Sequence, residues 1–572
     1  MKTYTLILIL ALSLGLMVGA HLTADVASAD PIPGQRIQVP VIWTTEGWET
    51  EIRVQNVGTT TARAVLLLWG PYSEQCEPNN PGPIIAMCSI NIAPGAAQSW
   101  TLRDVWEDPM SGIIYSVDPD RADEACEAAR DALGDTFDWR EWEEEWDNGT
   151  GEDLTFGDPD GARGPSLAVS VTRLQVGVGG EAPRTSSYMG LSEAMEDVPD
   201  ETGAYTYFVP LNFDTYNPSR WQTTIYIQNS GTACTGVDIT FQTQDNCLEQ
   251  HWGTIDILAP GETVAIPSTL GGNEVGSAWL RSTQPLGVIV DEENADRDML
   301  LTYHGLPRAL GSIINHAPVI YKDFEGWNSG VQVQNLSRTF NAKVKVYFLD
   351  NGGGIITSIV DWICPQGSRT YFLPVIADLP EHYVGAVRVE SQAWLQPGGL
   401  AVDPPPVFSV VNLVNYLTRQ GLSYNTFPEQ EVLGVGTVAL PSLVKEVSPF
   451  VDGIIWSSEI LVQNLNPSYL GDVTVRIDFY DAHGWVDSLC QTIPPRAVDR
   501  VDMAGVGILP PGWTGSGVVT WQCGGLHGID VLVVERAMGN VFSDLSKGYQ
   551  GVPLPNGPVP PVPLQCPGCP AP

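Results

Sequence analysis

Hydrophobic and polar residues alternate along most of this chain with a period of two. The clearest alternating segment begins with Trp, ends with Gln-Asn and occurs four times. In each copy the Trp, a Thr or Ser, and two Ile or Val residues occupy every second position, which predicts a half-buried β-strand. The copies are WETEIRVQN (48–56), WQTTIYIQN (221–229), WNSGVQVQN (327–335) and WSSEILVQN (456–464).

Further landmarks follow each copy in the same order. A second alternating run comes first, then a Pro-containing turn, a strand that begins near Gly, an apolar strand and finally a Tyr. The turns are APG (93–95), APG (259–261), CPQG (364–367) and IPPR (493–496), and the closing residues are Tyr188, Tyr303, Tyr424 and Tyr549. A pattern that recurs in order four times indicates four related units of about 110–130 residues.

Short strands with regular turn signals and little helical periodicity are typical of β-sandwiches. We therefore expect an all-β fold of four tandem immunoglobulin-like β-sandwich modules, arranged as a rod, with the four repeated Trp residues in the cores. A β-propeller is less favoured because its blades are shorter than this period. The expected boundaries are a signal peptide at 1–29, module 1 at 30–192 with a mostly helical acidic insertion at 118–165, module 2 at 193–306, module 3 at 307–427, module 4 at 428–552, and a Pro-rich tail with CPGC at 553–572.

The first residues have the pattern of a secretory signal. Lys2 precedes an apolar run at 6–18, and the small residues Ala27, Ser28 and Ala29 precede Asp30, as at a cleavage site. The run is short for a membrane span, so a cleaved signal is favoured over a retained anchor. We expect an extracellular or cell-surface protein whose mature chain has no integral membrane segment.

Charge narrows the choice of partners. The chain has 28 Lys and Arg against 67 Asp and Glu, a formal net charge of −39, which repels nucleic acid and anionic lipid. Ten Cys residues fit an oxidising compartment. The expected local pairs are Cys76 with Cys88, Cys234 with Cys247, and Cys490 with Cys523, while Cys566 and Cys569 form the terminal CPGC and Cys126 and Cys364 have no obvious partner.

The acidic insertion offers the candidate contact and metal residues. Residues 119–133 have helical periodicity after a capping Asp118, and Trp139, Trp142 and Trp146 would share one face of a second short helix. These Trp residues either pack on their own module or form a docking surface for a basic or carbohydrate-like partner. Oxygen ligands for calcium are gathered at Asp147, Asp153, Asp158 and Asp160, but the spacing of a calcium loop is missing. We expect no other cofactor.

No catalytic constellation stands out in the sequence. The seven His residues are scattered, and HExxH, phosphate-loop and GxSxG patterns do not occur. A pair of carboxylates for glycoside chemistry stays possible, because an acidic sandwich offers many candidates.

The Trp-to-Asn strand, the APG turn and the GSA strand together resemble repeats of uncharacterised exported bacterial proteins. More broadly they resemble the immunoglobulin-like or CARDB-like adhesion modules of bacterial cell surfaces. The resemblance covers nearly all of the mature chain, implies extracellular scaffolding or adhesion, and transfers no catalytic residue.

The sequence therefore favours a secreted or cell-surface structural or adhesive protein without catalytic activity. Its partner would be a surface or extracellular polymer or protein, or a second copy of the chain. Two alternatives stay open: a carbohydrate-binding or polysaccharide-active extracellular protein, and a subunit of an extracellular filament that assembles through strand edges.

Overall fold

The structure is a computed structural model. It describes residues 33–70, 83–106, 108–131, 133, 163–176, 183–192, 198–216, 220–244, 249–397, 399–429, 436–448, 454–523, 528–538, 544, 546–554 and 566. No helix within these ranges is long and apolar enough to cross a membrane.

Antiparallel strands form four large pairs of sheets, each with five strands in the outer sheet and four in the inner sheet. In the first pair the outer order is β4 (Ile85–Cys88), β3 (Arg63–Trp69), β6 (Met110–Val117), β1 (Arg36–Ile42), β9 (Leu191–Ser192), and the inner order is β5 (Ala97–Arg103), β2 (Trp48–Asn56), β7 (Leu167–Gln175), β8 (Arg184–Met189). In the second pair the outer order is β13 (Glu249–Leu258), β12 (Thr235–Thr243), β15 (Glu274–Ser282), β10 (Tyr205–Asp214), β18 (Leu306–Pro307), and the inner order is β14 (Thr263–Pro267), β11 (Trp221–Asn229), β16 (Leu286–Asn294), β17 (Met299–His304).

The third and fourth pairs repeat these orders. In the third pair the outer order is β22 (Ile355–Ile363), β21 (Ala342–Asp350), β24 (Tyr383–Gln392), β19 (Ile314–Lys322), β29 (Phe427–Pro428), and the inner order is β23 (Ser368–Phe372), β20 (Trp327–Asn335), β27 (Val407–Asn415), β28 (Gln420–Asn425). In the fourth pair the outer order is β33 (Gly484–Ile493), β32 (Val473–Asp481), β35 (Trp513–Cys523), β30 (Thr437–Lys445), β38 (Val552–Pro553), and the inner order is β34 (Val498–Asp502), β31 (Ile455–Asn464), β36 (Ile529–Met538), β37 (Ser546–Gln550).

A few short elements complete the chain. A small hairpin pairs β25 (Trp394–Leu395) with β26 (Ala401–Val402) in the third pair. The described helices are α2 (Ala122–Asp131) and the single 3-10 turns η2 (Arg308–Leu310), η3 (Leu373–Val375) and η4 (Met503–Gly505).

The all-β prediction is confirmed, and so is the expected place of the repeated Trp residues. Alternating side chains from both sheets of a pair meet in a buried apolar cluster, as the period of two requires. The four Trp residues are between 3% and 6% exposed. The division into independently folding immunoglobulin-like modules with the expected boundaries stays a prediction.

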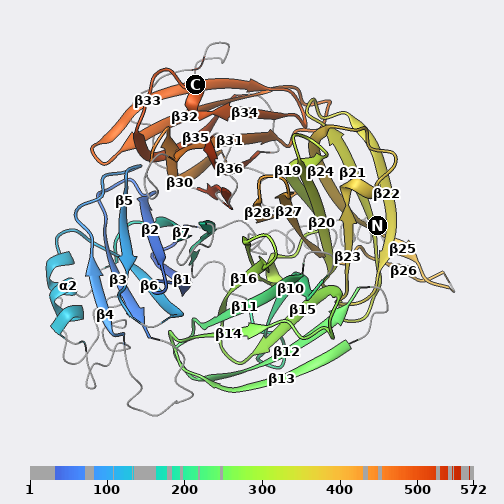
Figure 1. Ribbon diagram of the computed structural model, residues 1–572, viewed down its shortest axis with the longest axis horizontal. Coiled ribbons are helices and arrows are strands. Elements are labelled where there is room, and N and C mark those ends of the chain that lie inside the picture. Colours follow the sequence, from blue (N-terminus) through green and yellow to red (C-terminus); the bar gives the residue numbers. More distant parts are fainter. Residues whose placement is uncertain are drawn as a thin grey trace, which may run out of the picture.

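The sheet pairs do not form the expected rod. They close into a ring in which the inner sheets face the centre (Figure 1). The first and last pairs touch: Ser187 Oγ donates to Gly548 O at 2.9 Å, and Val57, Ala168 and Met189 belong to the apolar cluster of the fourth pair. The rod prediction is wrong because the inner sheets also carry apolar and small side chains on the surfaces between pairs, and closing the ring removes that surface from water.

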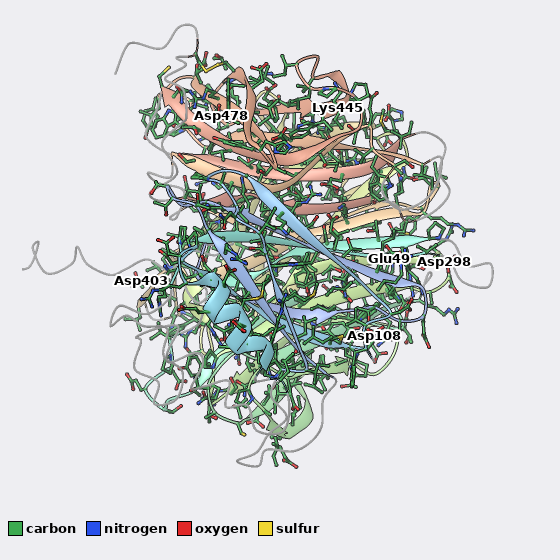
Figure 2. All side chains as sticks on the ribbon, turned by 90° about the vertical axis from the view of Figure 1, so that its left-hand side faces the viewer. Glu49, Asp108, Asp298, Asp403, Lys445 and Asp478 are labelled. Atoms are coloured by element: carbon green, nitrogen blue, oxygen red, sulfur yellow. A yellow bond between two sulfur atoms is a disulfide. The ribbon has the colours of Figure 1, made fainter. Side chains whose placement is uncertain are left out.

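Helix α2 lies on the outer sheet of the first pair, which faces the viewer in Figure 2. Its predicted apolar stripe, which includes Ala122, Ala125 and Ala129, packs against Val65 and Tyr115. The described part of the acidic insertion therefore covers its own sheet and does not project from it.

Two disulfides correct the expected Cys pairs. Cys88 bonds to Cys126 and not to Cys76, because α2 lies beside β4. Cys490 bonds to Cys566 and not to Cys523, because residue 566 lies against β32.

The other Cys residues are either disulfide-bonded or outside the described ranges. Cys126 and Cys364, for which the sequence offered no obvious partner, are both disulfide-bonded, as are Cys234 and Cys523. Cys76, Cys247 and Cys569 lie outside the described residues.

Candidate functional site at the third–fourth interface

The repeated Gln-Asn sequence joins neighbouring sheet pairs. At three of the four interfaces the Gln side chain donates from Nε2 to a backbone carbonyl of the adjacent pair: Gln55 to Gly517 at 3.1 Å, Gln228 to Gly112 at 3.2 Å, and Gln334 to Ala278 at 3.2 Å. We call these contacts the Gln latches.

A Ser hydroxyl forms a reciprocal bond at the same three interfaces. Ser516 donates to Gly95 O at 2.7 Å, Ser111 to Gly261 O at 2.6 Å, and Ser277 to Gln366 O at 3.1 Å. Each acceptor lies in the Pro-containing turn that the sequence repeat predicted. Three interfaces are thus held by paired hydrogen bonds whose donors come from the repeat.

The third–fourth interface departs from this pattern. Ala386 of the third pair occupies the position that Ser111 occupies in the first pair and Ser516 in the fourth. On the neighbouring strands, Leu349 lies opposite Ala386, Trp69 opposite Ser111 and Tyr480 opposite Ser516. Gln463 forms no corresponding latch with the described residues, whereas its Oε1 is buried without a hydrogen-bond partner like the Oε1 atoms of Gln55, Gln228 and Gln334.

The turn of the fourth pair differs as well. Gly95 and Gly261 have φ angles of 80° and 81°, and Arg496 occupies the matching position with a φ of 62°. A left-handed conformation is costly for a residue with a Cβ and is found mainly where the surrounding structure imposes it, often at functional sites.

Packing explains why Gly occupies this position in the first and second pairs. A Cβ at Gly261 would lie 2.4 Å from the Trp69 ring, and a Cβ at Gly95 would lie 2.4 Å from the Tyr480 ring. The smaller Leu349 replaces the ring beside Arg496, so the interface keeps an opening.

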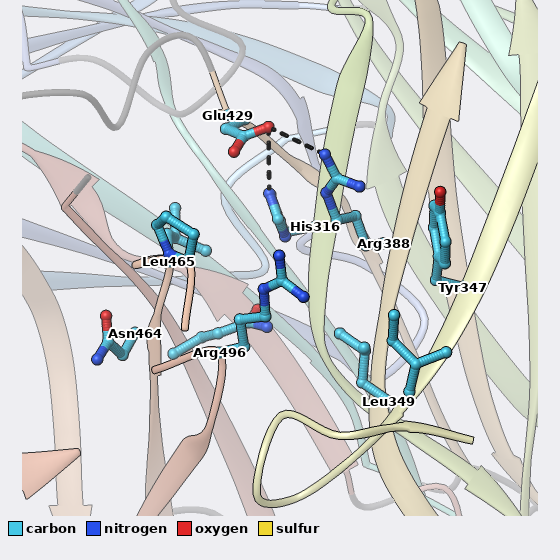
Figure 3. Close-up of a pocket in the computed structure, with 11 residues that line it drawn as sticks. His316, Tyr347, Leu349, Arg388, Glu429, Asn464, Leu465 and Arg496 are labelled. Atoms are coloured by element: carbon cyan, nitrogen blue, oxygen red, sulfur yellow. Dashed lines mark ion pairs between the residues drawn. The ribbon is translucent and has the colours of Figure 1, made fainter. Parts of the chain in front are cut away.

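This opening is a cavity of about 160 Å³ (Figure 3). Polar side chains from both sheet pairs line it: His316, Tyr347, Arg388, Glu429, Gln463 and Arg496. The first four come from the third pair and its end, and the last two come from the fourth pair.

In the cavity, Glu429 and Arg388 have charged partners, whereas Arg496 has none among the described residues. The Glu429 carboxylate lies 3.9 Å from His316 Nε2 and 3.7 Å from Arg388, and Arg388 also pairs with Glu390 at 2.6 Å. Arg496 forms no ion pair with any described residue. The cavity therefore keeps one unneutralised guanidinium.

His316 is the titratable group that faces this cluster. Burial lowers its pKa, Glu429 acts in the opposite direction, and the nearby charges of Arg388 and Arg496 lower the pKa further. The imidazole is therefore neutral at physiological pH and can donate or accept one hydrogen bond at Nε2.

The outer face of β21 and β22 continues from the cavity. Lys345 Nζ lies 4.5 Å and Arg388 Cζ 5.5 Å from the centre of the Tyr347 ring. At the far end, the Trp362 ring is 48% exposed and meets Trp394 edge to face at 5.0 Å.

This arrangement is suited to binding. It offers guanidinium and amide donors beside exposed aromatic rings, and among the lining residues no nucleophile lies beside a general base. Within the described part of the chain, no group of three metal-ligating side chains is present.

The site residues expected from sequence are not the ones found here. Trp139, Trp142 and Trp146, and the calcium candidates Asp147, Asp153, Asp158 and Asp160, lie outside the described residues. One signal in the sequence lay at the cavity: the turn IPPR places Arg at the Gly position of the APG pattern, where CPQG has Gln.

Comparisons with known proteins add little. No family model and no curated protein matches the chain. Among solved structures, it is similar to a crystal structure of a tetra-tandem repeat in the extending region of a large adhesion protein, with 11% identity over 87% of this chain and 93% of that chain and a TM-score of 0.09. That score carries no argument about fold or function, so the resemblance to CARDB-like modules stays a prediction.

Proposed function

We propose that this chain is an exported structural or adhesive protein without catalytic activity, which binds an extracellular polymer or protein through the outside of its ring. The observation that carries the proposal is how the repeat residues are used. The Gln latches and Ser hydroxyls join three interfaces of the ring, and a polar cavity of about 160 Å³ lies at the third–fourth interface, where the described residues form no such latch.

Buried polar contacts between the sheet pairs support a rigid scaffold. Arg173 of the first pair binds Asp291 of the second in a bidentate ion pair at 2.8 and 2.6 Å. Lys547 of the fourth pair donates to Thr172 of the first at 2.9 Å. Because a buried charge that loses its partner is strongly destabilising, these contacts oppose opening of the ring.

Export is supported by the N-terminal signal pattern and by the disulfides. Cys88–Cys126 ties α2 to the edge strand β4, and Cys490–Cys566 ties the tail to β33. Both would form in an oxidising compartment.

The experiment is to incubate the purified mature chain with intact bacterial cells and with isolated cell-wall and capsular polymers. We expect saturable binding with no change in polymer chain length, read by pull-down and by product chromatography. Shortening of any polymer would overturn the non-catalytic part of the proposal, and absence of binding to every surface would overturn the adhesive part.

A further inference from the structure

We propose that the outer face of the third sheet pair is a binding site for a carboxylated glycan, a chain of uronic acid sugars. The site is the strip formed by Trp394, Trp362, Lys343, Lys345, Tyr347, Arg388 and Arg496, which we call the cationic–aromatic strip. This inference rests on the proposed adhesive function and names the ligand class.

The strip is continuous on one face of the outer sheet. Trp362 lies opposite Lys343, and Ser358 opposite Tyr347, which in turn lies opposite Arg388. Trp362 and Ser358 are four residues apart along β22, which corresponds to a distance of roughly 13 Å. Several sugar units therefore fit between the Trp pair and the cavity.

Among the described residues, other parts of the chain contact three of the outer sheets, and on the third sheet the contact is the edge-to-face packing of Trp394, from the β25–β26 hairpin, on Trp362. Helix α2 covers the first, and residue 566 is tied to the fourth. On the third, Trp362 is 48% exposed and the neighbouring Leu395 is 68% exposed. Exposed apolar side chains gathered at one place indicate a contact surface.

Charge distinguishes the strip from the rest of the molecule. It carries Lys343, Lys345, Arg388 and Arg496, whereas Glu390 and Glu429 are the carboxylates paired with it, in a chain of net charge −39. Neither Lys forms an ion pair with a described residue. A local positive surface on an acidic protein attracts a polyanion and keeps it away from the remaining surface.

The cavity end favours a carboxylate in particular. The Glu429 carboxylate already lies near His316 and Arg388, which shows that a planar carboxylate fits between these groups. Arg496 on the opposite wall has the donors for a second one, and guanidinium and carboxylate match in geometry.

The aromatic end favours a sugar over an acidic peptide. The C–H faces of a pyranose ring are flat and apolar, and they pack on the face of an indole ring. A uronic acid polymer offers such faces and carboxylates together at regular intervals, so it complements both halves of the strip.

The test measures binding of oligogalacturonate to the full mature chain by isothermal titration calorimetry. We expect Trp362→Ala and Arg496→Gly each to weaken binding roughly fivefold to tenfold. Raising the salt concentration to about 0.5 M should weaken binding further, because the charges lie at the surface. Arg496→Gly places at this turn the residue that two other turns contain, so the variant retains its fold.

Matched controls test whether the effect is local. Trp485→Ala removes a partly exposed Trp from β33, the corresponding edge strand of the fourth pair. Gln366→Gly changes the equivalent turn position of the third pair, where φ is 60°. Both controls should bind oligogalacturonate within about twofold of the unmodified chain.

Four outcomes would overturn the inference. They are no binding of oligogalacturonate, equal binding of its fully methyl-esterified form, binding of dextran sulfate alone, and binding that both strip variants leave unchanged. If the strip variants instead abolish a dimer of the chain, the face is an interface between copies. In each case binding to whole cells can persist, so failure of this inference is distinguishable from failure of the proposed function.

Discussion

At the scale of single residues, the repeat is built from side chains that bond to backbone. The closing Tyr of each unit donates its hydroxyl to a carbonyl of the first strand, where that strand bulges: Tyr188 to Val41, Tyr303 to Leu211, Tyr424 to Val319 and Tyr549 to Ser442. The bulge leaves backbone groups without strand partners, and the Tyr hydroxyl satisfies them.

We predict that Tyr303→Phe destabilises the protein by about 1–3 kcal/mol, since it leaves the buried Leu211 carbonyl and amide without their partner. Chemical denaturation monitored by Trp fluorescence measures the change. Tyr469→Phe is the control, because Tyr469 is 80% exposed and the change should have no measurable effect. Equal stability of the two variants would contradict the bonding role.

A second prediction concerns the buried Glu292, whose Oε2 accepts a hydrogen bond from Asn412 of the third pair. Burial raises its pKa from 4.5 to about 8, although the Asn412 bond acts in the opposite direction. Because the folded pKa lies above the unfolded one, the stability due to protonated Glu292 is fully present below about pH 4.5. It is lost as pH rises towards 8.

The free energy of unfolding of Glu292→Gln should therefore equal that of the unmodified chain near pH 4.5 and exceed it by roughly 4 kcal/mol at pH 8. Urea denaturation at both pH values tests this, with the exposed Glu201→Gln as control. A stability difference that does not grow with pH would show that Glu292 is ionised in the folded protein.

At the scale of elements, the Pro-containing turns decide how closely two sheet pairs approach. Gly at the left-handed position allows the Trp69 or Tyr480 ring to pack on the turn, and Arg496 at the same position lines the cavity at the third–fourth interface. Gly is therefore required at this turn position where an aromatic ring of the neighbouring pair packs on it.

We predict that Gly261→Ala costs about 2–4 kcal/mol, because a Cβ adds a clash with Trp69 to the left-handed backbone cost. Gly512→Ala isolates the backbone cost alone, since Gly512 has a φ of 79° and nothing within 4 Å, and it should cost about 1 kcal/mol. Melting temperatures of both variants give the comparison. Equal losses would show that the ring–turn contact contributes nothing.

At the scale of the whole molecule, polar side chains at the centre link sheet pairs that are distant in sequence. His304 Nε2 lies 2.8 Å from Met189 O, and the His304 amide donates to Asn425 Oδ1 at 3.0 Å. Three of the four pairs meet at this one residue. Burial lowers the pKa of His304 to about 4, so it stays neutral at the centre of the ring.

We predict a compact particle in solution. For about 540 residues a compact chain has a radius of gyration of about 24 Å, whereas a rod of four units, each about 40 Å long, would have roughly 40–50 Å. Small-angle X-ray scattering of the mature chain distinguishes the two, and a value near that of the rod would contradict the ring.

The strands, their order and the core were predictable because they depend on local signals. The period of two set the strand faces, and Trp48 and its three counterparts proved to be buried. The apolar stripe of Ala122, Ala125 and Ala129 also identified α2. The pairing of Cys126 was missed because it depends on where α2 lies on the sheet.

By itself, the sequence determined an all-β chain with a fourfold repeat, since hydrophobic alternation and turn residues act over a few positions. Only the tertiary structure decided that the repeats close into a ring and that Arg496 faces His316 and Arg388 across an interface. Those contacts join residues about 100 or more positions apart, and they depend on how well whole sheet surfaces fit each other, which no local pattern encodes.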